Sequence, residues 1–175
     1  DIDQVVTGAL RGAFEYQGQK CSACSRVYVP RSAWKLFHEK LEADIQAVTM
    51  GSVTDFSHLV NAVIDENSFD TIDGYISRAE SSDQAEVIIG GSRDKSKGYF
   101  VEPTVIRAKD PYYESMKEEI FGPVLTAFVY EDEDLDQTLD ILDNTSEYAL
   151  TGAVFATDRA EVNRITERLA HTAGN

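Results

Sequence analysis

The residues best suited to covalent chemistry lie in one short loop that carries a thiol. The stretch reads Phe14-Glu15-Tyr16-Gln17-Gly18-Gln19-Lys20-Cys21-Ser22-Ala23-Cys24-Ser25-Arg26. We expect a helix to end near Gly18, because glycine adopts the left-handed backbone angles of a helix end without a steric penalty. A strand is expected to begin near Arg26. A turn held between two packed elements can fix one reactive atom in place, and Lys20 could help to stabilise a Cys21 thiolate.

The spacing Cys21-x-x-Cys24 allows two other kinds of thiol chemistry, a dithiol redox pair and half of a zinc site. Zinc needs two further ligands, and the chain has no second cysteine pair and no histidines at His-x3–5-His spacing. A redox pair of the thioredoxin type would follow a strand and open a helix, whereas this pair follows a helix and precedes a strand. We therefore predict no metal site, and we predict that Cys24 fills space in the core.

Two motifs in this chain resemble those of the aldehyde dehydrogenase family. The stretch from Gly18 to Arg26 is similar to the family's nucleophile loop, whose common form is Gly-Gln-x-Cys. A later stretch, Lys117-Glu118-Glu119-Ile120-Phe121-Gly122-Pro123-Val124, is similar to the family's Glu-x-Phe-Gly-Pro segment. The residues flanking Cys21 look most like those of the Δ1-pyrroline-5-carboxylate (glutamate-γ-semialdehyde) dehydrogenases. Residues 98–104 and 150–155 also resemble the family, so the likeness covers essentially the whole chain.

The resemblance implies a role for four residues and NAD as the cofactor. Cys21 would be the nucleophile that forms a thiohemiacetal with the aldehyde and, after hydride transfer to NAD, a thioester that water hydrolyses. Its backbone N–H would supply half of an oxyanion hole. Glu119 would contact the nicotinamide-side ribose and Phe121 the nicotinamide ring. Ser22 would line the aldehyde end of the substrate pocket. Apart from the resemblance, the positive charge of Lys20 could assist an acidic substrate or the thiolate.

Four of these residues also have a purely structural interpretation. A loop cysteine is often a small buried hydrophobic residue, a glutamate in an acidic chain is usually solvated, a loop serine often bonds its own backbone, and Lys20 could simply be solvated. Three functional alternatives follow. The chain could be a non-catalytic thiol protein or interaction module with the same fold, a dithiol redox protein, or an aldehyde dehydrogenase with another substrate.

Composition narrows the possible partners. The chain has 175 residues and a formal net charge of −15, so it cannot neutralise nucleic-acid phosphates and is not attracted to anionic membranes. No apolar run is long enough for a transmembrane helix. We expect one domain over residues 1–175, a small-molecule aldehyde as substrate, and neither nucleic acid nor membrane as partner.

The resemblance also implies that the chain is a segment of a larger enzyme. We expect the NAD-binding domain, the general base, the asparagine of the oxyanion hole and the loop that holds the substrate carboxylate to lie outside these residues. The family resemblance further implies a homodimer or higher homo-oligomer and a location in the mitochondrial matrix, although no targeting segment is visible here.

Alternating strand and helix patterns predict an α/β domain, a layered sheet with flanking helices like the catalytic domain of aldehyde dehydrogenases. Helices are expected over 3–17 with Asp3 as N-cap, from Ser32 to about 50, from an Asn67 cap to 81, and from 134 to 142 with Leu135, Leu139 and Leu142 buried. A last helix should begin after Asp158. Strands are expected at 26–29, 86–91, 99–101, 104–106, 124–130 and 151–156.

Overall fold

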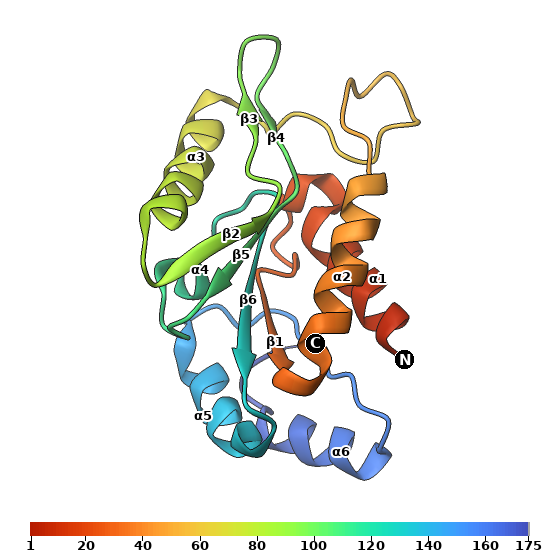
Figure 1. Ribbon diagram of the computed structural model, residues 1–175, viewed down its shortest axis with the longest axis vertical. Helices are drawn as coiled ribbons and strands as arrows, with labels where there is room; N and C mark the ends of the chain where they lie inside the picture. Colours follow the sequence, from red (N-terminus) through yellow and green to blue (C-terminus); the bar gives the residue numbers. More distant parts are fainter. Residues whose placement is uncertain (175) are drawn as a thin grey trace.

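A four-stranded sheet forms the centre of the computed structural model, which describes residues 1–174 (Figure 1). Its strands lie in the order β1 (Arg26–Pro30), β6 (Val124–Tyr130), β5 (Thr104–Ala108) and β2 (Ala85–Ile89). The first three are parallel to one another, and β2 joins the edge antiparallel to β5. A separate two-stranded ribbon pairs β3 (Arg93–Asp94) with β4 (Phe100–Val101). The predicted α/β class is confirmed.

Both faces of the sheet are buried, because alternate side chains of each strand enter different cores. Leu125 of β6 and Val105 of β5 join one core, whereas Val124 and Ile106 join the other. This explains why β6 is an almost continuous apolar run, Val-Leu-Thr-Ala-Phe-Val-Tyr, rather than an alternation of apolar and polar residues.

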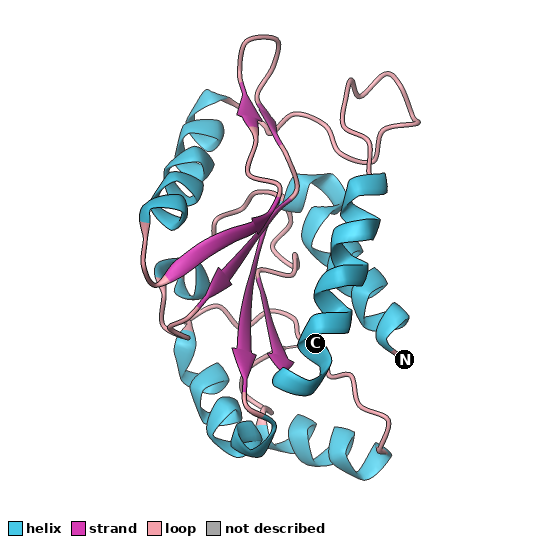
Figure 2. Ribbon diagram, in the orientation of Figure 1, coloured by secondary structure: helices cyan, strands magenta, loops and turns pink. Residues whose placement is uncertain are grey.

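Helices cover the two faces, so the molecule has three layers (Figure 2). The first core holds α1 (Ile2–Phe14) and α2 (Arg31–Ala47), and the second holds α3 (Glu66–Ser81). The short helix α4 (Glu114–Lys117) and the helices α5 (Leu135–Thr145) and α6 (Arg159–Arg168) complete the described chain. None of the helices within residues 1–174 combines the length and hydrophobicity that crossing a membrane requires.

The observed helix starts correct two predicted caps. The carboxylate of Asp1, not Asp3, caps α1 by accepting the Asp3 N–H at 3.0 Å. Asp65, not Asn67, caps α3 by accepting the Ser68 N–H at 2.8 Å. In both cases an aspartate two residues earlier satisfies the unpaired N–H groups of the first turn. The predicted cap Asp158 is confirmed.

The predicted strand at 151–156 is wrong. This stretch has the composition of a strand, yet within residues 1–174 no neighbouring strand offers it a hydrogen-bonding ladder. It runs over the protein surface, where Phe155 lies on Gly8 of α1, and the Gly174 N–H reaches the Ala149 and Leu150 carbonyls. The predicted burial in α5 is also only partly right, because Leu139 is buried whereas Leu135 and Leu142 are partly exposed.

Candidate active site

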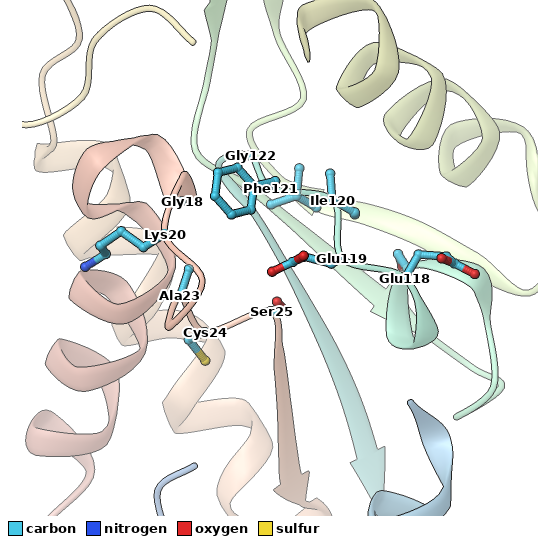
Figure 3. A pocket seen from close by; sticks show the side chains of 12 residues that line it. Gly18, Lys20, Ala23, Cys24, Ser25, Glu118, Glu119, Ile120, Phe121 and Gly122 are labelled. Carbon is cyan, nitrogen blue, oxygen red and sulfur yellow. The ribbon is translucent and has the colours of Figure 1, made fainter. Parts of the chain in front are cut away.

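The parallel pairing of β1 with β6 brings the two sequence motifs together. Arg26 of β1 lies opposite Thr126 of β6, so the segments that lead into the two strands meet at the amino end of this strand pair. The Gly18–Ser25 loop precedes β1, and the segment 118–123 precedes β6. A small cleft opens between them (Figure 3). Its lining residues are Gly18, Lys20, Ala23, Cys24, Ser25, Ser115, Glu118, Glu119, Ile120, Phe121, Gly122 and Val124.

Contact between two glycines sets how closely the motifs approach. Gly18 has a φ of +66°, and a Cβ at this position would lie 2.1 Å from the carbonyl oxygen of Gly122. It would also lie 2.8 Å from the carbonyl oxygen of Ala13. These neighbours are backbone atoms, which cannot rotate away as the end of a side chain can. Gly18 is therefore required both for its left-handed conformation and for the close approach.

The backbone around Cys21 is a tight turn anchored on α1. The Ala23 N–H donates to the Lys20 carbonyl at 3.0 Å, which leaves Cys21 and Ser22 as the two central residues of the turn. The Cys24 N–H donates to the Gly12 carbonyl of α1 at 2.9 Å. The side chains of Cys21 and Ser22 are exposed, so the structure presents the predicted nucleophile to the surface.

The second thiol occupies a different environment. Cys24 packs against the core beneath α1 and α2, and its Sγ donates to the Arg26 carbonyl at 3.4 Å. Burial raises the pKa of the Cys24 thiol, because a thiolate there would lose its hydration. In Figure 3 the Cys24 sulfur points away from Glu119 and Phe121. The prediction that Cys24 fills space in the core is confirmed in part, because Cys24 packs against the core but is only partly buried and also borders the cleft.

The predicted cofactor contacts lie across the cleft from the thiol loop. The Glu119 side chain points toward this loop, whereas the neighbouring Glu118 points away from it (Figure 3). Phe121 is 45% exposed and has a φ of +56°, a left-handed conformation that is rare for a bulky residue. Such strained residues persist only where the surrounding structure holds them, and they are common at functional sites.

The Lys20 side chain interacts with Glu15 and Tyr16 rather than with the residues across the cleft. Its ammonium group lies 3.4 Å from the Glu15 carboxylate and 5.7 Å from the centroid of the Tyr16 ring. Arg11 also binds Glu15, at 2.6 Å, and this hydrogen bond, assisted by Lys20, lowers the pKa of the Glu15 carboxyl. In Figure 3 the Lys20 nitrogen points away from Glu119. Its role toward substrate stays a prediction, as do the roles of Ser22 and the other site residues.

One lining residue could not be recognised from the sequence. Ser115 is only 2% exposed, yet its hydroxyl has no hydrogen-bond partner within residues 1–174. A serine in a four-residue helix, between Glu114 and Lys117, gives no local signal of burial. The described residues contain no group of three His, Cys, Asp or Glu side chains arranged to hold a metal.

The close approach at Gly18 can be tested by adding one methyl group. We expect Gly18→Ala to destabilise the chain by about 2–4 kcal/mol, because alanine is strained at positive φ and its Cβ meets backbone oxygens. Gly74→Ala is the matched control, since this helical glycine faces only the end of the Arg78 side chain at 3.2 Å and should change stability by about 1 kcal/mol or less. Urea denaturation measures both, and equal effects would contradict the role of Gly18.

The two thiols should differ in reactivity. With iodoacetamide at pH 7.5, we expect Cys21 to be alkylated at least about tenfold faster than Cys24, because Cys21 is exposed whereas burial raises the pKa of Cys24. Peptide mass spectrometry after timed quenching gives both rates. A reversible Cys21–Cys24 disulfide in mild oxidant, with equal alkylation of both thiols, would favour the dithiol redox interpretation instead.

Comparison with known proteins agrees with this geometry. The profile of the aldehyde dehydrogenase family matches residues 1–175. The mitochondrial Δ1-pyrroline-5-carboxylate dehydrogenase of Dictyostelium discoideum is 54% identical over the whole chain, which spans 31% of that relative. The NAD-bound crystal structure of the Mycobacterium tuberculosis Δ-pyrroline-5-carboxylate dehydrogenase superposes with a TM-score of 0.91 at 43% identity, over all of this chain and 31% of that one. A γ-glutamyl-γ-aminobutyraldehyde dehydrogenase from Burkholderia cenocepacia superposes at 0.90 with 32% identity, over 99% of this chain and 34% of that one. This chain belongs to the aldehyde dehydrogenase family.

Proposed function

We propose that the full-length protein is an NAD-dependent aldehyde dehydrogenase that oxidises glutamate-γ-semialdehyde to glutamate, with Cys21 as its nucleophile. The observation that carries this proposal is that the exposed Cys21 loop and the Glu119–Phe121 segment meet at the cleft between the loops that lead into β1 and β6. Two of the relatives named above, from Dictyostelium discoideum and Mycobacterium tuberculosis, are Δ1-pyrroline-5-carboxylate dehydrogenases, and they support the choice of substrate.

The chemistry assigned to Cys21 starts from its thiolate. The sulfur attacks the aldehyde carbon, so a C–S bond forms and the carbonyl oxygen becomes an oxyanion. The Cys21 N–H is one donor to this oxyanion, and a second donor would come from outside this chain. Loss of hydride converts the thiohemiacetal into a thioester. Water then cleaves the C–S bond, releasing the carboxylic acid and restoring the thiol.

The residues across the cleft fit one end of NAD, which when bound supplies the acceptor for the hydride. Within residues 1–174 no hydrogen bond or ion pair engages the Glu119 carboxylate, which points into the cleft. A free carboxylate can accept hydrogen bonds from both hydroxyls of a ribose. Phe121 offers an exposed ring for contact with the nicotinamide. The remaining cofactor contacts would come from another part of the protein.

Substrate selection is assigned to the residues that flank the thiol. Ser22 shares the tight turn with Cys21, and its exposed hydroxyl can contact the aldehyde end of a bound substrate. Lys20 could attract an acidic substrate, but its ammonium group would have to share or leave its contact with Glu15. A carboxylate-binding loop outside this chain would hold the other end of the semialdehyde.

The assembly and location of the protein are part of the same proposal. The enzyme would act as a homodimer or larger homo-oligomer, and it would work in the mitochondrial matrix. The location is supported by the mitochondrial relatives from Dictyostelium discoideum and Homo sapiens, which are 54% and 47% identical to this chain.

The nucleophile and the substrate can be tested together in the full-length protein. NADH formation is followed with glutamate-γ-semialdehyde and with a plain aliphatic aldehyde, for wild type, Cys21→Ala and Cys24→Ala. We expect activity on the semialdehyde to fall by more than about 10³-fold in Cys21→Ala and to persist in Cys24→Ala. Oxidation of the aliphatic aldehyde alone would refute the substrate. Wild-type inactivity toward both would favour a non-catalytic protein.

The cofactor contact can be tested with two adjacent glutamates. Glu119→Gln keeps the shape of the side chain but loses the charge that strengthens hydrogen bonds to the ribose, so the KM for NAD should rise about tenfold. Glu118→Gln is the matched control, since its side chain points away from the thiol loop (Figure 3) and its KM for NAD should stay within about twofold of wild type. Equal behaviour of the two variants would refute the assignment.

A further inference from the structure

A strained turn precedes the thiol loop. Three consecutive residues have left-handed backbone angles, with φ of 53° at Tyr16, 59° at Gln17 and 66° at Gly18. Glycine adopts this conformation freely, but each of the two other residues pays roughly 1–2 kcal/mol for it. A run of this kind needs contacts that hold it, because the strain favours a return to ordinary angles.

Gln19 supplies those contacts from its backbone N–H and from both ends of its side-chain amide. The Gln19 backbone N–H donates to the Tyr16 carbonyl at 3.1 Å, and its side-chain Nε2 donates to the same oxygen at 3.3 Å. Its Oε1 accepts the Ile64 N–H at 2.8 Å. The segment around Ile64 is fixed in turn, since the Val63 N–H donates to the Tyr99 carbonyl at 2.9 Å.

These contacts join three parts of the chain at a point two residues before Cys21. One end of the amide holds the carbonyl of the left-handed turn, and the other end holds the loop between α2 and α3. The glutamine amide donates at one end and accepts at the other. Glutamate keeps the acceptor for Ile64 but has no side-chain N–H for the Tyr16 carbonyl, and methionine keeps the length but lacks both side-chain contacts. The backbone N–H of residue 19 still donates to the Tyr16 carbonyl in either variant.

We propose that Gln19 is a positioning residue, whose side-chain amide clamps the left-handed turn at residues 16–18 and thereby sets where the Cys21 thiol lies. The clamp acts on the backbone before Cys21, and it does not require Gln19 to touch the substrate. The kinetic part of this inference rests on the proposed aldehyde dehydrogenase activity. The structural part does not.

The test compares Gln19→Met and Gln19→Glu with wild type in the full-length protein. Hydrogen exchange of the Ala23 and Cys24 amides, which close the thiol loop, reports its local opening. We expect exchange to accelerate at least about tenfold in Gln19→Met and less in Gln19→Glu, because the glutamate retains one contact. We also expect kcat to fall about 10- to 100-fold with the KM values for NAD and aldehyde within about twofold, since a misplaced nucleophile slows chemistry more than binding.

Gln4→Met is the matched control, because Gln4 is exposed on α1 and this variant should leave both readouts unchanged.

A double-mutant cycle of Gln17 and Gln19 tests whether the Gln19 side chain acts by holding the strained turn. Gln17→Gly removes the strain at one residue of the turn, so less clamping is needed. In the Gln19→Met background it should restore kcat and slow the exchange several-fold. When Gln19 is intact no such gain is expected, because the variant then mainly removes the buried Gln17 side chain.

The outcomes separate this inference from the proposed function. Unchanged exchange in Gln19→Met, or faster exchange with unchanged kcat, would overturn the positioning role. Equal effects of Gln17→Gly in both backgrounds would also overturn it. If wild type oxidises neither aldehyde, the proposed function fails. Whether Gln19 clamps the turn can then still be decided from the hydrogen-exchange rates of the single variants and of the double-mutant cycle with Gln17→Gly.

Discussion

The parallel pairing of β1 with β6 is the constraint on which the candidate site depends. Two segments far apart in the sequence meet only because each leads into one of these neighbouring strands. Parallel strands share a direction, so the loops before them must lie at the same end of the sheet. The contact of Gly18 with the Gly122 carbonyl then fixes how close the two loops come. Neither glycine carries chemistry, but together they determine the width of the cleft.

The site is built at the cost of backbone strain. Among the non-glycine residues of the described chain, positive φ occurs at Tyr16, Gln17 and Phe121, all beside the cleft or just before the thiol loop. The sheet is the scaffold that carries these segments, with buried apolar residues on both faces and a ladder of hydrogen bonds between β5, β6 and β1. A rigid scaffold that carries strained loops can present one thiol in one orientation, which a flexible loop cannot.

The two cysteines show how environment separates chemically identical groups. Cys21 lies at the exposed centre of a tight turn, whereas Cys24 packs against the core of α1 and α2. Burial raises the pKa of Cys24 and keeps it as the thiol, so its sulfur is a poor nucleophile. The Cys-x-x-Cys spacing alone could not distinguish them, because the difference arises from the tertiary packing of Cys24 against α1 and the core, where its N–H also donates to the Gly12 carbonyl.

Sequence alone determined the α/β class, most element positions and the two motifs, because apolar periodicity and turn residues are local signals. The strand over 124–130 was predicted with its observed limits for this reason. The expected strand at 151–156 failed, since a strand exists only when a neighbour completes its ladder. The helix caps are Asp1 and Asp65 rather than the predicted Asp3 and Asn67. Several polar side chains lie near each helix start, and the path of the chain decides which of them reaches the free N–H groups.

Tertiary structure alone decided that Lys20 pairs with Glu15, that Ser115 lines the cleft and that Gln19 reaches Ile64. Each of these contacts joins residues through folded geometry that no local pattern encodes.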